Sequence, residues 1–396
     1  MTAPTVLRGP DGGGVTAAGG FRAAGVAAGI KASGAPDVAL VVNDGPRHDA
    51  AAVFTTNRVR AAPVLWSEQC AREGRFRAVI LNSGGANACT GPAGFADTHR
   101  TAEHVAELLG VAPIEVAVCS TGLIGERLPM PALLAGADSA AQALSAAGGA
   151  GAAEAIMTTD TVPKQAVVAH PDGWSVGGMA KGAGMLAPGL ATMLVVLTTD
   201  ARTDAGVLDV VLREATRRTF DRIDSDGCMS TNDTVLLLAS GASGVAPAPD
   251  ALGEAVTAVC ADLARQLIAD AEGATKDIRI DVVNAASEED AVLAARAVAR
   301  SNLLKCAIHG EDPNWGRILS AIGTTEAAFE PDAVDVAING VTICRDGSAH
   351  GDRAAVDMAG REVAITIDLR TGRAAATVWT NDLSAMYVHE NSAYST

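Results

Sequence analysis

Short apolar runs alternate with longer amphipathic segments along this chain. Most of the short runs are rich in Val and Ile and lie close to Gly, Asn or Asp, which is typical of β-strands. We predict strands at residues 37–43, 51–55, 77–82, 115–120, 165–170, 192–198, 234–239, 278–283, 335–338 and 363–369. The Ala- and Gly-rich stretch at 12–29 is interpreted as loop.

The longer segments carry apolar residues at helical spacing. Residues 254–271, for example, place Val256, Val259, Leu263 and Leu267 on one face. The same argument predicts helices at 98–109, 202–219 and 288–301, and one helix followed by a loop within 135–153. Because strands and helices are mixed along the whole chain, the fold class is α/β (α+β).

The clearest break in this pattern lies at 273–277, where a long predicted helix ends and new strands begin. A chain of 396 residues is long enough for two to three domains of about 150 residues each. We therefore predict a larger region at 1–275 and a smaller C-terminal domain at 276–396.

Composition and charge exclude several classes of protein. The formal net charge is −16 and only 3% of residues are aromatic, so neither nucleic acid nor an anionic membrane surface is an expected partner. No apolar run approaches the ~18 residues of a membrane span. The seven Cys form no CxxC pair and no secretion signal is visible, which indicates mainly reduced, buried Cys in a cytoplasmic protein.

Two segments resemble known ligand motifs but lack the required context. Residues 182–187 match G-x-G-x-x-A, yet Pro188 and Gly189 follow where a dinucleotide site needs a helix, so we interpret them as a Gly-rich loop. Asp224 and Asp226 could belong to a calcium loop, but that loop would begin with the cation Arg222. No metal motif of the HExxH type is present.

Two other segments carry candidate chemistry. At 189–192 a Gly-containing loop leads into a strand whose first residue is Thr192; as a free N-terminus, its hydroxyl would be a nucleophile and its amine a base. Thr121 and Gly122 end another strand, where a turn can offer donors to an oxyanion. The local pattern leaves open the simpler alternatives, a strand that begins with Thr and an ordinary turn.

A set of sequence blocks distributed along nearly the whole chain resolves these alternatives. The blocks are 81–91 (LNSGGANACTG), 119–125 (CSTGLIG), 156–160 (IMTTD), 181–185 (KGAGM), 191–194 (ATML), 230–234 (STNDT), 270–273 (DAEG), 312–317 (DPNWGR) and 390–395 (ENSAYS). In this order they resemble the ornithine acetyltransferase (glutamate N-acetyltransferase) family of arginine biosynthesis.

The resemblance implies a layered αββα sandwich with a smaller C-terminal α/β domain, and a chain that cleaves itself between Ala191 and Thr192. Thr192 would then carry an acetyl group from N²-acetyl-L-ornithine to L-glutamate, releasing ornithine and N-acetylglutamate. Thr121 and Gly122 would bind the oxyanion. The substrate-binding residues carried over by the resemblance are Thr158, Lys181, Thr192, Glu272, Asn391 and Thr396.

The resemblance implies neither a metal nor a redox cofactor, but acetyl-CoA is a possible second acetyl donor. The two chains, 1–191 and 192–396, are expected to stay together as α2β2. Three alternatives remain: a related self-cleaving aminopeptidase or amidase with an N-terminal nucleophile, a monofunctional ornithine acetyltransferase, and a binding protein without activity.

Overall fold

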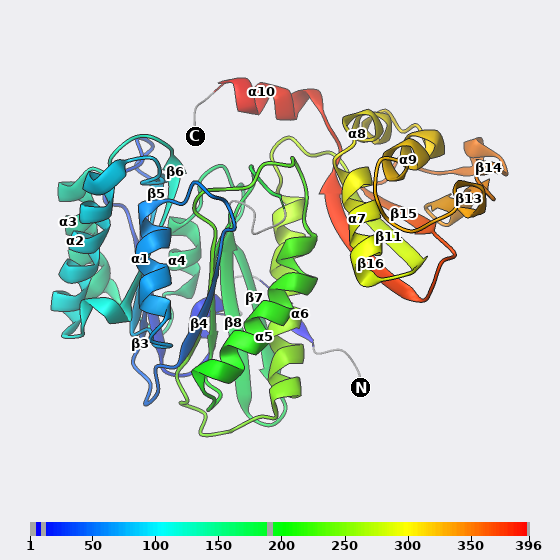
Figure 1. Ribbon diagram of the computed structural model, residues 1–396. Helices are drawn as coiled ribbons and strands as arrows, with labels where there is room; N and C mark the ends of the chain where they lie inside the picture. Colours follow the sequence, from blue (N-terminus) through cyan, green and yellow to red (C-terminus); the bar gives the residue numbers. More distant parts are fainter. Residues whose placement is uncertain (1–4, 9–12, 188–192, 394–396) are drawn as a thin grey trace.

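The computed structural model describes residues 5–8, 13–187 and 193–393. Two β-sheets form its larger part (Figure 1). The first has the order β2-β3-β5-β6, and the second has the order β1-β7-β8-β9-β10-β4. Their strands are β1 (Val6–Arg8), β2 (Phe21–Val26), β3 (Val38–Asn43), β4 (Ala50–Phe54), β5 (Ala78–Gly85), β6 (Val116–Leu123), β7 (Lys164–His170), β8 (Trp174–Lys181), β9 (Leu194–Thr199) and β10 (Thr234–Ala239).

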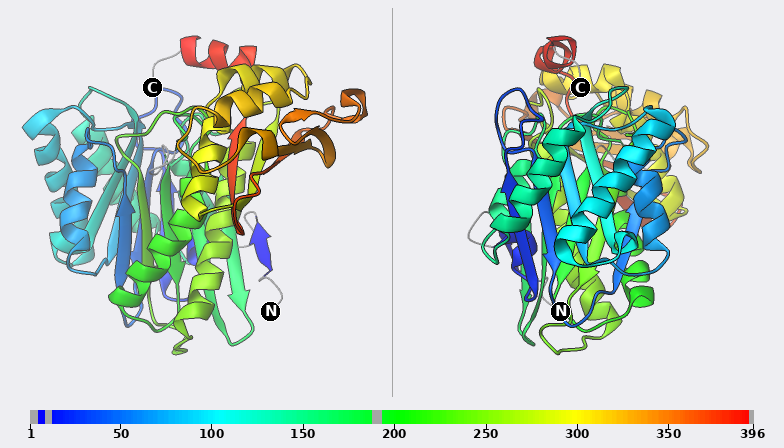
Figure 2. Two further views of the ribbon diagram at one scale, coloured as in Figure 1. Left: turned by 45° about the vertical axis from the view of Figure 1, so that its right-hand side comes forward. Right: turned by 90° about the vertical axis from the view of Figure 1, so that its left-hand side faces the viewer.

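Helices cover the outer faces of these two sheets. Helices α2 and α3 lie in front of the first sheet in the right-hand view of Figure 2, and α5 and α6 pack against strands of the second. Helix α1 runs along the edge of β6, where Ser67 Oγ donates to the Val118 carbonyl over 2.7 Å. The helices are α1 (Ala62–Ala71), α2 (Gly91–Leu109), α3 (Met130–Ala143), α4 (Gly149–Ala155), α5 (Ala205–Arg218) and α6 (Pro249–Ala269).

Strands β9 and β10 show why the order of layers is helix, sheet, sheet, helix. Leu194 and Val196 of β9 belong to the core shared with the first sheet. Val195 and Leu197, which point the opposite way, belong to the core under α5 and α6. Because successive strand residues face opposite sides, a strand buried on both faces reads as a continuous apolar run. The expected αββα sandwich is confirmed.

A third sheet with its own apolar core follows in the chain. Its order is β14-β13-β12-β15-β11-β16, and α7 packs on β11 and β16. The elements are β11 (Asp277–Ala285), α7 (Glu288–Ala299), α8 (Asn302–His309), α9 (Trp315–Ile322), β12 (Asp335–Ile338), β13 (Val341–Arg345), β14 (Ser348–Ala349), β15 (Glu362–Asp368), β16 (Ala374–Asn381) and α10 (Ala385–Ala393). Short 3-10 turns occupy Gly14–Thr16, Pro113–Glu115, Phe220–Arg222, Pro331–Ala333 and Arg353–Ala355.

Helix α10 leaves this third sheet and crosses back over the sandwich (Figure 1). Its Tyr387 lies against Gly273, where a Cβ would come within 2.2 Å of the Tyr387 backbone nitrogen. The division of the chain between 275 and 276 stays a prediction. Gly273, before this boundary, and Tyr387, after it, are in contact.

Several predicted elements need correction. Residues 21–26, interpreted as loop, form strand β2, whose small side chains allow α4 to approach closely; a Cβ on Gly25 would lie 1.9 Å from the Gly151 carbonyl oxygen. Helix α2 begins at Gly91 rather than 98, with Pro92 in its first turn. The segment 135–153 contains the end of α3 and most of α4. Thr192, the predicted start of a strand, lies outside the described residues.

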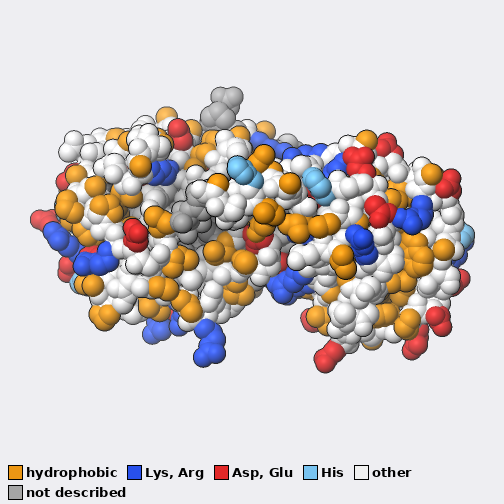
Figure 3. Space-filling view, turned by 90° about the horizontal axis from the view of Figure 1, so that it is seen from above, with side chains coloured by type: hydrophobic (Ala, Val, Ile, Leu, Met, Phe, Trp, Pro, Cys, Tyr) orange, Lys and Arg blue, Asp and Glu red, His pale blue; other side chains and the backbone are white. Residues whose placement is uncertain are grey.

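Charged side chains of both signs are interspersed on the face seen from above (Figure 3). None of the helices in the described ranges is both long and apolar enough to cross a bilayer. Of the seven Cys, four are buried and three are exposed, and all are free thiols.

Candidate active site

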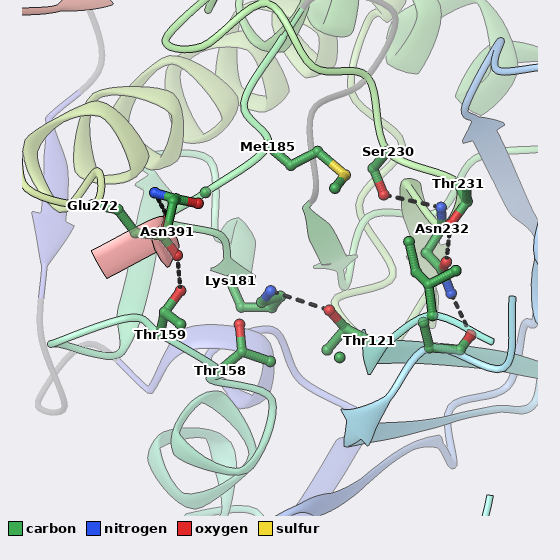
Figure 4. Close-up of a pocket in the computed structure, with 14 residues that line it drawn as sticks. Thr121, Thr158, Thr159, Lys181, Met185, Ser230, Thr231, Asn232, Glu272 and Asn391 are labelled. Carbon is green, nitrogen blue, oxygen red and sulfur yellow. Dashed lines mark hydrogen bonds between the residues drawn. The ribbon is translucent and has the colours of Figure 1, made fainter. Parts of the chain in front are cut away.

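Six of the nine predicted site residues line one cavity of about 80 Å³ (Figure 4). They come from the end of β6, the loop before β7, the end of β8, the segment after α6 and helix α10. These six are Thr121, Gly122, Thr158, Lys181, Glu272 and Asn391. The other three, Ala191, Thr192 and Thr396, lie outside the described residues. The structure brings the six together, while the role of each stays a prediction.

Thr121 and Gly122 lie near the end of strand β6, next to the parallel strand β5. The turn predicted after residue 120 is instead part of this strand, which continues to Leu123. Gly122 has a φ of 127°, and a Cβ there would lie 2.5 Å from the Gly85 backbone nitrogen. Only glycine fits this position without moving β5. The close approach of the two strands therefore fixes the backbone that carries Thr121 at the cavity.

Lys181 is buried, with 2% of its surface exposed. Its Nζ donates to the Thr121 Oγ1 over 3.1 Å, and the two side chains point toward one another in Figure 4. Among the described residues its ammonium has no ion-pair partner. Burial lowers the pKa of Lys181, while the charges of Asp160 and Glu272 partly oppose this. A buried ammonium has three N–H donors, and only one acceptor among the described residues, the Thr121 hydroxyl, is hydrogen-bonded to it. Such a group is suited to bind an anion.

Glu272 forms the opposite, acidic wall. Its Oε1 accepts from Thr159 Oγ1 over 2.6 Å, and its Oε2 accepts from Asn391 Nδ2 over 3.0 Å. A Cβ on Gly184 would approach the Glu272 carboxylate to 2.5 Å, so the Gly-rich loop is what leaves room for it. The cavity thus has a cation on one wall and a carboxylate on the other.

Four residues with polar side chains in the cavity wall were not singled out by the sequence reasoning, namely Thr159, Ser230, Thr231 and Asn232. Asn232 Nδ2 donates to the carbonyls of Ala86 over 2.7 Å and Ser120 over 2.8 Å, which ties the ends of β5 and β6 together. Thr231 Oγ1 orients that amide by donating to Asn232 Oδ1 over 2.6 Å. These residues fall inside the blocks 156–160 and 230–234, but no spacing rule marks their role.

Met193, the first described residue after 187, lies beside the buried carboxyl group of Asp233. The Met193 backbone N–H donates to Asp233 Oδ1 over 3.0 Å, and Asp233 is fully buried. Burial raises the pKa of Asp233 well above its usual range. The covalent neighbour of Met193 is Thr192, so this hydrogen bond holds the residue that follows the predicted nucleophile.

Comparisons with known proteins agree with the resemblance. The model of the ArgJ family matches residues 22–396. The arginine biosynthesis bifunctional protein ArgJ of Streptomyces coelicolor is 68% identical over 96% of this chain and 99% of its own length. That of Thermobifida fusca is 63% identical over 96% and 100%. The solved ornithine acetyltransferase of Mycobacterium tuberculosis, complexed with ornithine, is 62% identical over 48% of this chain and 100% of that chain, with a TM-score of 0.45.

The family match covers more than half of the chain, and the relatives align over nearly their full lengths. The chain therefore belongs to the ArgJ family, the ornithine acetyltransferase family that its sequence blocks resemble, and is an acyltransferase of arginine biosynthesis.

Proposed function

We propose that this chain transfers an acetyl group from N²-acetyl-L-ornithine to L-glutamate through a covalent ester on Thr192. The observation that carries the proposal is the cavity itself. The Lys181 ammonium, the Glu272 carboxylate and the Thr121 hydroxyl line the same small space, which supports roles in binding an anion, binding a cation and stabilising an oxyanion.

Self-cleavage comes first in this proposal. The Thr192 hydroxyl attacks the Ala191 carbonyl carbon, the Ala191–Thr192 amide breaks, and the Ala191 acyl group moves to the Thr192 oxygen. Breaking the amide frees the α-amine of Thr192, and water then hydrolyses the ester, which releases the Ala191 carboxylate and restores the Thr192 hydroxyl. The amine, with a reference pKa of about 7.7–8.0, then serves as the base for its own hydroxyl.

Acetyl transfer uses the same hydroxyl twice. It attacks the acetyl carbonyl of acetylornithine, the amide bond breaks, and ornithine leaves with the proton that the α-amine had taken. Glutamate's amine then attacks the acetyl ester, giving N-acetylglutamate and regenerating the hydroxyl. Both tetrahedral intermediates carry an oxyanion, for which Thr121 and the Gly122 N–H supply donors.

The charges of the cavity suit both amino acids. Lys181 is placed to pair with the carboxylate that acetylornithine and glutamate share, and Glu272 is placed to receive the side-chain ammonium of ornithine.

Other candidate nucleophiles near the cavity are poorly placed. Cys119 is 2% exposed, and burial raises the pKa of its thiol to about 12. The Ser120 hydroxyl is buried and donates to Asn82 Oδ1 over 2.6 Å. A thiol that stays protonated at neutral pH is a weak nucleophile, which favours a residue outside these two.

We further propose a cytoplasmic α2β2 assembly that needs no metal or redox cofactor and uses acetyl-CoA as a second acetyl donor. The test is to mix purified protein with acetylornithine and glutamate and to measure ornithine release, beside a second assay with acetyl-CoA and glutamate. Release of ornithine that depends on glutamate supports the transferase. Peptide hydrolysis without acetyl transfer would favour the aminopeptidase alternative. Activity in the first assay but not in the second would favour a monofunctional enzyme.

A further inference from the structure

A row of three ion-paired side chains ends beside the segment that carries Lys181. Lys164 Nζ lies 2.5 Å from Asp270 Oδ2 and 2.7 Å from Asp160 Oδ1, and the side chains of Lys164 and Asp160 are fully buried. Asp160 is hydrogen-bonded to the backbone N–H of Gly182, the residue after Lys181. Of Asp270, Lys164, Asp160 and Lys181, only Lys181 lines the cavity.

Asp160 also joins the two segments that carry predicted substrate contacts. Its Oδ2 accepts from the Thr158 backbone N–H over 3.0 Å, and its Oδ1 accepts from the Gly182 backbone N–H over 2.6 Å. Gly182 directly follows Lys181 in the chain. One carboxylate thus fixes the loop of Thr158 and the end of the strand that carries Lys181.

The groups that face Lys181 come from every side of the cavity. Asp160 and Glu272 are the carboxylates whose charges favour the ammonium, and Lys164 is the cation that opposes it. Asp233 is a third carboxyl group near Lys181, and burial raises its own pKa. The remaining polar contact is the Thr121 hydroxyl. On its far side, Asp160 also faces Lys31, a partly buried cation. Among the described residues, Asp160 is the carboxylate that accepts a hydrogen bond from the residue next to Lys181.

We propose that Asp160 is a positioning residue that keeps Lys181 charged and aligned with Thr158, so that Lys181 can bind the substrate carboxylate. The inference rests on the proposed function, because it concerns the same reaction and the same cavity. Asp160 touches no substrate in this account and acts only through its neighbours.

This role predicts a specific dependence on pH. The pKa of Asp160, which burial would raise, is instead held at about 2 by Lys181 and Lys164, so it stays ionised over the working range. Lys181 binds a carboxylate while it is protonated and loses that ability as pH rises through its pKa. Removing the negative charge of Asp160 therefore moves the alkaline rise of KM to lower pH.

Two variants separate this role from a purely structural one. In Asp160→Asn, the alkaline rise of KM for acetylornithine should move down by about one pH unit or more, as expected for loss of a nearby opposite charge. In Lys164→Met, which removes a cation that repels the Lys181 ammonium, the alkaline rise of KM should move to higher pH. The substrate's own amine titrates in the same way with every variant, so the differences report on the protein.

The measurement is KM and kcat against pH for the purified, cleaved wild type and both variants, with the melting temperature as a control for folding. Shifts in opposite directions, seen mainly in KM, support the proposal. Shifts in the same direction, or none, overturn it. If Asp160→Asn is insoluble, the upward shift in Lys164→Met decides alone. A wild type without acetyl transfer would instead contradict the proposed function.

Discussion

At the scale of single residues, Thr121 is the predicted catalytic residue whose contacts the structure describes. Its hydroxyl accepts a hydrogen bond from Lys181, which leaves its own proton for an oxyanion. Gly122, where a Cβ would collide with β5, follows it directly in the chain, and its N–H is the second predicted donor. The two predicted donors are neighbours in strand β6, so their geometry depends on how β6 pairs with β5.

Replacing Thr121 by Ala should lower kcat on the order of 10²–10³-fold, the usual cost of losing one oxyanion donor. Thr121→Ser keeps the hydroxyl and serves as the matched control, with kcat close to that of the wild type. Steady-state kinetics of ornithine release measures both. Equal activity of the Ala and Ser variants would show that the hydroxyl is not a donor in the reaction.

The residue scale also marks the limit of what the sequence reveals. Lys181 and Glu272 could be named because they stand in recognisable blocks, 91 positions apart. Asp160 stands in such a block as well, but its importance comes from contacts with Lys164 and Gly182 that only the fold creates. Nothing in its local spacing distinguishes it from a surface aspartate.

At the scale of elements, helix α10 completes the acidic wall from more than a hundred residues away in sequence. It contains no buried residue, and Asn391 reaches the cavity from it to donate to Glu272. A segment of this kind adds little to stability, so its contribution is expected in substrate binding.

Asn391→Ala should therefore raise KM for acetylornithine by about tenfold or more, because a hydrogen bond to a charged group is worth roughly 1.5–3 kcal/mol. The melting temperature should change little. Val388→Ala, on the same helix and with 59% of the wild-type side chain exposed, is the control that should leave KM unchanged. An unaltered KM in Asn391→Ala would show that α10 does not contribute to substrate binding.

The elements that could be predicted were those with strong periodicity. Residues 234–239 and 335–338 form strands with the predicted bounds, because a continuous apolar run marks the first, alternation marks the second, and turn residues lie near both. Strand β2 was missed because its Ala and Gly residues give no such signal; close packing against α4 selects them. Tertiary contact overrides local propensity in that strand.

At the scale of the whole molecule, the proposed cut falls between two neighbouring strands. Strands β8 and β9 pair antiparallel over Val176–Lys181 and Leu194–Thr199, and every residue of β9 is buried. The two chains produced by cleavage would therefore share a sheet and a core, and should not separate without unfolding.

A denaturing gel of purified protein should show two bands of about 19 and about 21 kDa, from 39.8 kDa shared between 191 and 205 of 396 residues. In solution the assembly should have a mass near 80 kDa, which is two copies of 39.8 kDa. Thr192→Ala should give one uncut band. A fully active wild type in one band would contradict self-cleavage, and a native mass near 40 kDa would contradict the dimer.

The central claim is that Thr192 carries the acetyl group, and a trapped intermediate tests it most directly. Cleaved enzyme mixed with acetylornithine in the absence of glutamate should gain about 42 Da, the mass of one acetyl group, on the chain that begins at Thr192. Tandem mass spectrometry should place the acetyl group on Thr192, and adding glutamate should remove it. An acetyl group on Cys119, Ser120 or Cys228, or none on either chain, would contradict the account.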